Sequence, residues 1–334
     1  MNVTDLDAFF SRTGLASAHV ARQLTPLTGG VSSDIWRVDF SDGRTVCVKR
    51  ALAKLKVAAD WQAPVSRNAY EWAWMQFAST VLPHAVPQPL AHDESLGMFA
   101  MTYLEPAAHP VWKQQLLSGH VDPASAAMVG QAMGLLHQAS AHRADLAAAF
   151  DTGESFHALR LEPYLLATAL KHPHLAGPLW ALVARTAAHR TALVHGDVSP
   201  KNILVGPHGP ILLDAECAWY GDPAFDAAFC LNHLLLKRLV VPQQAAALHQ
   251  AFEALVQAYF HEASFEPRAD LEERCAQLLP ALMLARMDGK SPVEYITDET
   301  DRERVRAFAI PLITRATASL AEVSGGWFQL PSHA

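Results

Sequence analysis

Cysteine is scarce in this sequence. The chain of 334 residues has four, and no two of them stand in a Cys-x-x-Cys spacing; they are Cys47, Cys217, Cys230 and Cys275. Scattered cysteines support neither a structural zinc site nor a disulfide framework. We therefore expect all four to be reduced residues of the core.

Charge and long apolar runs are also limited. Charged residues make up 18% of the chain and hydrophobic residues 51%, and the net charge is −7. No basic face indicates nucleic acid or an anionic membrane as a partner. The chain has no run of about 18 apolar residues, and its first ten residues lack the pattern of a secretory signal. We expect a cytoplasmic globular protein, monomeric or homodimeric, that binds neither nucleic acid nor membrane.

What the sequence does have is a regular polar pattern between apolar flanks. Residues 193–205 read LVHGDVSPKNILV and residues 211–216 read ILLDAE, which fixes the spacing of His195, Asp197, Asn202 and Asp214. At about 5% usage per residue type, His-Gly-Asp with an Asn five residues after the Asp arises by chance about once in 160,000 positions. The pattern therefore favours a functional site.

The residues between Asn202 and Asp214 predict a β-hairpin. With a loop over residues 207–209, the pairs 205/211 and 203/213 would bring Asn202 opposite Asp214. Facing residues have Cα atoms about 4.5–5.5 Å apart, so an amide oxygen and a carboxylate could hold one Mg²⁺. Asp197 lies just before this pair, where it could accept the proton of an attacking hydroxyl.

These residues resemble the catalytic core of the aminoglycoside phosphotransferase and choline kinase-like family, distant relatives of protein kinases. The resemblance implies that Asp197 is the catalytic base, that Asn202 and Asp214 bind magnesium, and that His195 organises the loop. It also implies ATP as the phosphate donor. The alternative is a buried histidine and a turn aspartate beside an ordinary hairpin.

A glycine-rich turn lies upstream, in residues 27–34. Gly29 and Gly30 would let the backbone approach a phosphate, and Ser32 and Ser33 would add donors. A plain hairpin turn is the alternative. Residues 54–61 resemble the corresponding stretch of methylthioribose kinases, where they could cover the nucleotide or form a surface loop.

Lys49 ends a predicted strand over residues 45–48. In a kinase-like lobe such a lysine reaches the α- and β-phosphates of ATP and is held by a glutamate from the next helix. Between Lys49 and Asp93 the only acidic residues are Asp60 and Glu71. Glu71 stands in a segment where Tyr70, Ala73, Trp74 and Phe77 fit one helical face, so we expect it to be the partner. A solvated Lys49 and an exposed Glu71 remain the alternative.

The predicted fold class is α+β, a bilobal protein-kinase-like fold. Residues 1–105 would form the nucleotide-binding lobe, with a helix over 4–22, two strands around turns in 24–48 and a buried strand over 98–104. In the family this last strand leads into the hinge, where backbone groups of Thr102, Tyr103 and Leu104 would bind adenine. Residues 106–334 would form a larger, mainly helical catalytic and substrate-binding lobe.

Several signals locate helices in the second part. Asp122 and Pro123 begin a helix that continues to about residue 139, and His137 on its apolar stripe is expected to be a core residue. Asp222 would cap a helix that begins near Pro223. Residues 245–260 and 271–287 form further helices. The resemblance implies that Asp226 braces the catalytic loop; a first-turn helix acid is the alternative.

The sequence favours a small acceptor. Only seven residues separate Asp214 from Asp222, whereas a protein kinase has a longer activation segment. Lys201 stands where relatives often have glycine, and it either faces the transferred phosphate or points to solvent. Arg286, Asp288, Lys290 and Glu294 are possible substrate contacts or solvated charges.

We therefore predict a small-molecule kinase that moves the ATP γ-phosphate to a hydroxyl of an aminoglycoside, amino alcohol or sugar-like metabolite. A catalytically silent ATP-binding or scaffold protein on the same fold is the alternative.

Overall fold

The computed structural model describes residues 3–17, 20–27, 33–52 and 67–331. The chain divides into two compact units. Unit 1 consists of Met1–His109 and Leu213–Glu216, and unit 2 of Pro110–Leu212 and Cys217–Ala334. Gly29, Gly30, Ser32 and the segment 54–61, for which the sequence suggested nucleotide contacts, lie outside the described residues.

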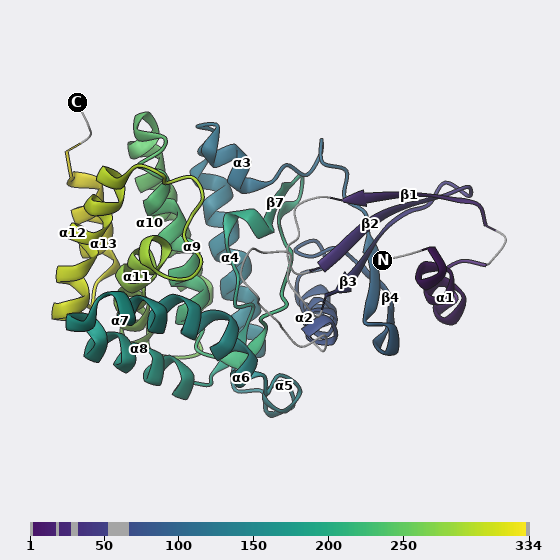
Figure 1. Ribbon diagram of the computed structural model, residues 1–334, viewed down its shortest axis with the longest axis horizontal. Coiled ribbons are helices and arrows are strands. Elements are labelled where there is room, and N and C mark those ends of the chain that lie inside the picture. Colours follow the sequence, from purple (N-terminus) through teal and green to yellow (C-terminus); the bar gives the residue numbers. More distant parts are fainter. Residues whose placement is uncertain (1–2, 18–19, 28–32, 53–66, 332–334) are drawn as a thin grey trace. The chain divides into compact units, whose positions relative to one another are not determined.

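A five-stranded antiparallel sheet in the order β1-β2-β3-β5-β4 forms the centre of unit 1 (Figure 1). Its strands are β1 (Arg22–Leu27), β2 (Ser33–Phe40), β3 (Thr45–Ala51), β4 (Pro89–Asp93) and β5 (Met98–Thr102). The expected antiparallel sheet is confirmed. Residues 24–48 contribute to three strands and not two, because Gly43 adopts φ +88° and turns the chain between β2 and β3.

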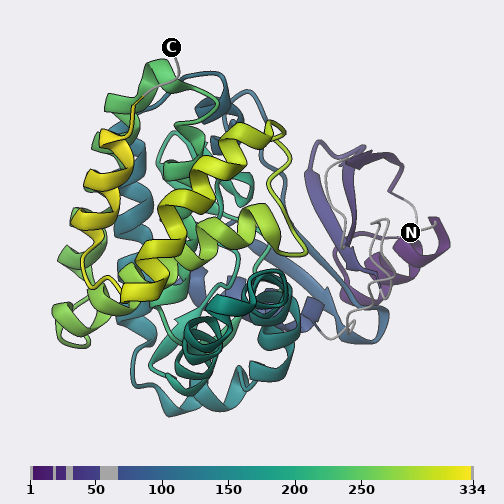
Figure 2. The ribbon, with the colours of Figure 1, turned by 60° about the vertical axis from the view of Figure 1, so that its left-hand side comes forward.

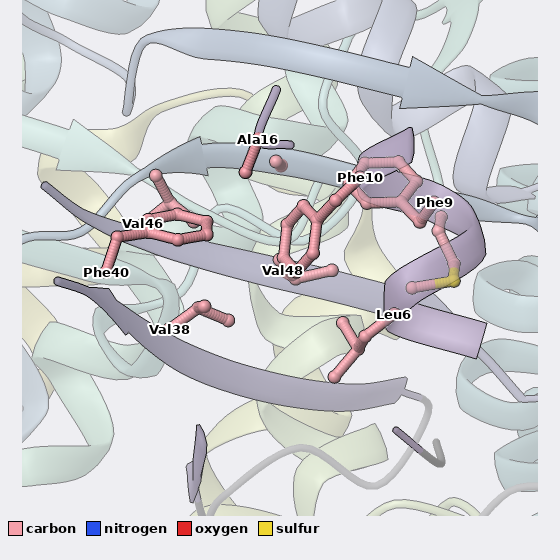
Figure 3. Close-up of a cluster of buried hydrophobic side chains, with 10 residues drawn as sticks. Leu6, Phe9, Phe10, Ala16, Val38, Phe40, Val46 and Val48 are labelled. Carbon is pink, nitrogen blue, oxygen red and sulfur yellow. The ribbon is translucent and has the colours of Figure 1, made fainter. Parts of the chain in front are cut away.

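Helix α1 (Val3–Thr13) packs on one face of this sheet. Figure 3 shows Phe9 and Phe10 of α1 against Val46 and Val48 of β3, all of them buried. The predicted helix over 4–22 is too long. It ends at Thr13 because Gly14 adopts φ +69°, and the chain then enters β1 at Arg22.

Helix α2 (Arg67–Val81) follows β3, and a short 3₁₀ helix η1 (Glu94–Leu96) joins β4 to β5. The buried face of α2 differs from the predicted one. Glu71, Trp74, Met75 and Ala78 are buried, whereas Tyr70, Ala73 and Phe77 are only half-buried. Glu71 therefore points inward, and the alternative of an exposed glutamate is excluded.

Unit 2 is mainly helical. Its α-helices are α3 (Trp112–Leu117), α4 (Pro123–Ser140), α5 (Ala144–Ala149), α6 (Gly153–Phe156), α7 (Ala167–Lys171), α8 (Ala176–Ala188), α9 (Ala224–Lys237), α10 (Ala245–Glu262), α11 (Arg268–Asp288), α12 (Glu299–Arg315) and α13 (Leu320–Gln329). Its other helices are the π-helix η2 (His157–Leu166) and the 3₁₀ helices η3 (Pro173–Leu175), η4 (Pro200–Asn202) and η5 (Pro242–Gln244). Helices α10 to α13, green to yellow in Figure 2, gather into one group.

The predicted helices of this part are confirmed. Asp122 caps α4 through the N–H groups of Ala124 and Ser125, and Asp222 accepts from the N–H of Ala224 at the start of α9. Helices α10 and α11 cover the segments 245–260 and 271–287. None of the helices in the described ranges combines the length and apolar character that a membrane crossing needs.

Two small antiparallel ladders complete unit 2. Strand β6 (Ala192–Val194) pairs with β9 (Trp219–Gly221), and β7 (Ile203–Gly206) pairs with β8 (Gly209–Leu212). The β7–β8 hairpin was predicted, but its register was not. The observed pairs are 205/210 and 203/212, because the loop has two residues, 207 and 208, the commonest hairpin length.

The predicted pairing of Asn202 with Asp214 is therefore wrong. Strand β8 ends at Leu212, and Asp214 adopts φ +69°, outside the extended conformation. A cation shared by these two residues no longer follows from the register of the hairpin. All four cysteines are buried thiols, as expected.

Candidate active site

Lys49 and its partners form an ion cluster inside unit 1. The Lys49 ammonium lies 2.7 Å from Oε1 of Glu71 and also forms an ion pair with Oδ1 of Asp214. Strand β3 holds Lys49 opposite Ile35 of β2 and Phe99 of β5. The predicted pair of Lys49 and Glu71 is thus present, and Asp214 joins it.

One ammonium faces two carboxylates in this cluster. Burial alone would lower the pKa of Lys49, but the charges of Asp214 and Glu71 outweigh it and raise that pKa. Burial, with the charge of Asp214, raises the pKa of Glu71 to about 7 against the lowering effect of Lys49. The cluster thus carries an excess of negative charge that an additional cation would balance.

Arg67, at the start of α2, was not recognised from the sequence. Its Nε donates to Oε2 of Glu216 at 3.0 Å and its Nη2 to the carbonyl oxygen of Leu52 at 2.6 Å. Its side chain is almost fully buried, so this contact ties the segment after Asp214 to α2 and to the end of β3. No fixed spacing marks such an arginine in the sequence.

The predicted hinge follows β5. The N–H of Thr102 donates to the carbonyl oxygen of Gln88 at 3.0 Å, so it is already engaged. The ring of Tyr103 lies under the Arg37 guanidinium, 4.5 Å from its centroid. Ser33, in the first position of β2, is buried, and its hydroxyl has no hydrogen-bond partner within the described residues.

In unit 2 a single carboxylate, that of Asp226 in the first turn of α9, holds the loop of residues 195–202. It accepts hydrogen bonds from the N–H groups of His195 and Gly196 at 2.7 and 2.8 Å. The expected brace is thus confirmed. His137 completes the arrangement as a buried core residue whose Nε2 lies 3.3 Å from Asp226 and whose Nδ1 lies 3.0 Å from the Tyr259 hydroxyl.

The loop has a fixed conformation. The His195 ring accepts a hydrogen bond from the N–H of Asp197 at 3.1 Å, a contact that fits the organising role implied by the family resemblance. Gly196 adopts φ +79°, and a Cβ there would lie 2.6 Å from the carbonyl oxygen of Cys217. Only glycine fits both restraints.

Three donors meet the same carboxylate oxygen, Oδ2 of Asp197. Asn202 donates its amide N–H from 2.9 Å, Arg160 lies at 3.0 Å and Lys201 at 3.1 Å. Asp197 is 3% exposed, so these contacts are made largely out of solvent. Lys201, whose side chain is 54% exposed, pairs with Asp197 and does not simply point to solvent.

Arg160 is the second residue that the sequence did not reveal. It lies on the π-helix η2 between two buried leucines, and its Nε donates to the carbonyl oxygen of Gly196 at 2.6 Å. It therefore contacts both the backbone and the carboxylate of the loop. An arginine inside an apolar helical segment was the available signal, because a buried charge requires a partner.

The donor chemistry of the predicted ligands fits a magnesium ion. The Asn202 amide nitrogen donates to Asp197, which leaves the amide oxygen for a cation, and Asp214 offers a carboxylate from a cluster with excess negative charge. Mg²⁺ takes one or two such oxygens and completes its shell with phosphate and water. The described residues contain no group of three or more His, Cys, Asp or Glu side chains placed to hold a metal.

A sequence profile of the phosphotransferase enzyme family matches residues 23–267. The chain belongs to the phosphotransferase enzyme family. It is similar to methylthioribose kinase 1 of Oryza sativa subsp. japonica, with 23% identity over an alignment of 268 positions that covers 71% of this chain and 62% of the rice protein. The chain thus spans less than two thirds of the length of this curated relative.

Solved structures of other phosphotransferases share the fold. A putative fructosamine-3-kinase from Thermobifida fusca has 18% identity and a TM-score of 0.57, covering 93% of this chain and 100% of its own. A choline/ethanolamine kinase family protein from Mesorhizobium loti has 15% identity and a TM-score of 0.54, covering 97% and 99%. The predicted protein-kinase-like fold is confirmed.

Proposed function

We propose that this phosphotransferase moves the γ-phosphate of ATP to a hydroxyl group of a small molecule. The observation that carries the proposal is the fixed carboxylate of Asp197, whose orientation is set by Asn202, Arg160 and the loop held by Asp226. A module that only binds a nucleotide has no need of such a base. This favours catalysis over the silent ATP-binding or scaffold alternative.

The proposed transfer forms one bond to phosphorus and breaks another. The acceptor hydroxyl oxygen forms a bond to the γ-phosphorus, and the bond from that phosphorus to the oxygen bridging it to the β-phosphate breaks. The hydroxyl proton passes to Asp197, and ADP leaves with the electron pair of the broken bond. Lys201, which pairs with Asp197, would offset charge on the transferred group.

Most of the residues proposed to bind ATP belong to unit 1. Lys49, oriented by Glu71, would bind the α- and β-phosphates. Asn202 and Asp214 would hold the magnesium ion, which when bound neutralises phosphate charge. Gly29, Gly30, Ser32 and Ser33 are proposed phosphate contacts, and backbone groups of Tyr103 and Leu104 are proposed to bind the adenine.

A substitution of Asp197 by Asn tests the proposal. In an ATP-consumption screen over amines, sugars and aminoglycosides, the wild-type chain should consume ATP only with an acceptor. Asp197→Asn should lower turnover by about 10²- to 10⁴-fold, the usual contribution of a general base, while ADP affinity stays within a few-fold. ATP loss that is independent of acceptor, or none at all, would favour the silent alternative.

A further inference from the structure

Basic side chains from three helices of unit 2 lie within electrostatic range of one another near the end of α9. We call them the basic cluster: Lys113 of α3, His233 and Lys237 of α9, and Arg286 of α11. His233 and Lys237 are one helical turn apart and share a face. Tyr295 joins them, because its hydroxyl lies 3.3 Å from Nδ1 of His233 and its ring centroid 4.7 Å from the Lys237 ammonium.

Lys237 is the unusual member of the cluster. It is fully buried, and its ammonium nitrogen has no hydrogen-bond partner within the described residues. Burying an unpaired charge is costly. The last turn of α9 and the Tyr295 ring offset part of that cost, but neither supplies a hydrogen-bond acceptor to its three N–H donors. Lys237 therefore has hydrogen-bond donors that no described residue satisfies.

Nearby acids do not fill it either. Glu294 pairs with Lys113, and its side chain is 64% exposed. Asp288 of α11 is buried but pairs with Arg306 and His172. Arg286 donates through Nη1 to the Tyr164 hydroxyl and to Ser291, while its Nε is buried without a partner in the described part of the chain.

The charges that act most strongly on His233 are positive. Burial, followed by the charges of Arg286, Lys237, Lys201 and Lys113, holds the pKa of His233 well below its usual value. Burial, followed by the charge of Lys113, lowers the pKa of Lys237 to about 7. An anion placed here would relieve this repulsion.

Lys201 links the cluster to the proposed base. Its ammonium lies 3.1 Å from Oδ2 of Asp197, and its charge acts on His233. Lys201 and Lys113 are partly exposed, whereas His233 is 5% exposed and Lys237 fully buried. Lys201 thus contacts Asp197 and also lies within electrostatic range of the buried His233.

We propose that the basic cluster is the part of the acceptor site that binds an anionic group, so that the acceptor is a hydroxyl compound carrying a carboxylate or a phosphate. This inference rests on the proposed function, because it assigns the acceptor of the same site. It favours an anionic acceptor over the aminoglycosides and amino alcohols that the sequence allowed, because Lys113, Arg286 and protonated Lys237 would repel a cationic amine.

Binding by the full chain without ATP tests the subsite apart from turnover. Glycerate and glycerol phosphate serve as anionic probes, glycerol as the neutral probe and ethanolamine as the cationic one, all at equal ionic strength. The two anions should raise the melting temperature more than the other probes. Lys237→Met should weaken the binding of whichever anion binds more tightly by about 10- to 100-fold, which is the contribution of a charged hydrogen bond. Lys171→Met, which changes an exposed lysine, should leave anion binding unchanged.

Two further measurements show whether Lys237→Met loses anion binding only, or whether it also disturbs folding or nucleotide binding. Lys237→Met should unfold no earlier than the wild-type chain, because it removes an unpaired buried charge, and it should keep the thermal shift caused by ADP. An equal response to glycerol, or an anion response that survives Lys237→Met, would overturn the subsite.

Turnover then distinguishes the two proposals. Phosphorylation of an amine with a KM unchanged in Lys237→Met would remove the anionic subsite and leave the kinase function intact. Anion binding lost in Lys237→Met, with no acceptor phosphorylated at all, would support the subsite and remove the kinase function. Phosphorylation of an anionic acceptor, with a KM raised in Lys237→Met and kcat within a few-fold, would support both.

Discussion

The ammonium nitrogen of Lys49 lies 2.7 Å from Oε1 of Glu71, with both side chains buried in unit 1. A buried ion pair adds little net stability, but the loss of one partner leaves the other charge buried and uncompensated. The pair is therefore explained better by the orientation of the lysine than by stability.

We expect Lys49→Met to lower the free energy of unfolding by about 3–5 kcal/mol, because Glu71 then remains buried without its cation. The double variant Lys49→Met with Glu71→Leu should recover most of that loss yet still bind ADP poorly. Urea unfolding and ADP titration measure the two effects. The exposed pair of Lys290 and Glu162, also 2.7 Å apart, is the control, since Lys290→Met should cost less than about 1 kcal/mol. Equal costs at the two lysines would contradict this account.

Gly196→Ala should destabilise the catalytic loop by about 2 kcal/mol or more, because a Cβ would press on the carbonyl of Cys217 in a left-handed backbone conformation. Gly325→Ala is the matched control. Its Cβ would meet nothing within 4 Å inside α13, so it should stabilise by about 0.5–1 kcal/mol. Thermal unfolding of both variants measures these changes in stability. If Gly196→Ala left the stability unchanged, the loop conformation would not be fixed.

Asp214→Ala should weaken ADP binding in the presence of Mg²⁺ by about tenfold or more, the worth of one charged contact. Without Mg²⁺ the two chains should bind ADP alike. Isothermal titration of ADP with and without Mg²⁺ measures both affinities. The control is Asp42→Ala, which changes an exposed acid of unit 1 and should bind ADP as the wild-type chain does. Equal weakening in both conditions would argue against Asp214 as a metal ligand.

Lys237 should make stability depend on pH. Its pKa is about 7 in the folded chain and 10.5 ordinarily, so the unfolded chain binds more protons between these values, and wild-type stability rises with pH there. The groups that face Lys237 are Lys113, Cys230, His233, Arg286, Glu294 and Tyr295. The advantage of Lys237→Met should be full below about pH 7 and shrink by about 1.4 kcal/mol per pH unit above it. Urea unfolding at three pH values measures the slope, and a constant difference would contradict the unpaired ammonium.

Much of the fold and of the loop of residues 195–202 could be predicted, because residues close together in the sequence determine these parts. Asp122 followed by Pro123 started a helix where expected, and the spacing of His195, Asp197 and Asn202 indicated a loop that the structure fixes by hydrogen bonds. Lys49 and Glu71 could be paired because few acids stood between the lysine and the next strand.

What could not be predicted depends on contacts between distant residues or on a single backbone angle. One residue in the loop after Gly206 changed the register of the hairpin, and the φ of Asp214 ended the strand. Arg160 lies 36 residues before the carbonyl of Gly196 that it binds, with no local pattern to connect them. Lys237 appeared as an ordinary helix-end lysine until its burial was known.

Helix α9 has Asp226 in its first turn and Lys237 at its end. Eleven residues of α-helix span about 16 Å. The length of α9 therefore sets the distance between Asp226, which holds the loop of residues 195–202, and Lys237. On the proposed function and the proposed anionic subsite, a shorter acceptor would need the cation one helical turn closer to the loop of residues 195–202, at the level of His233.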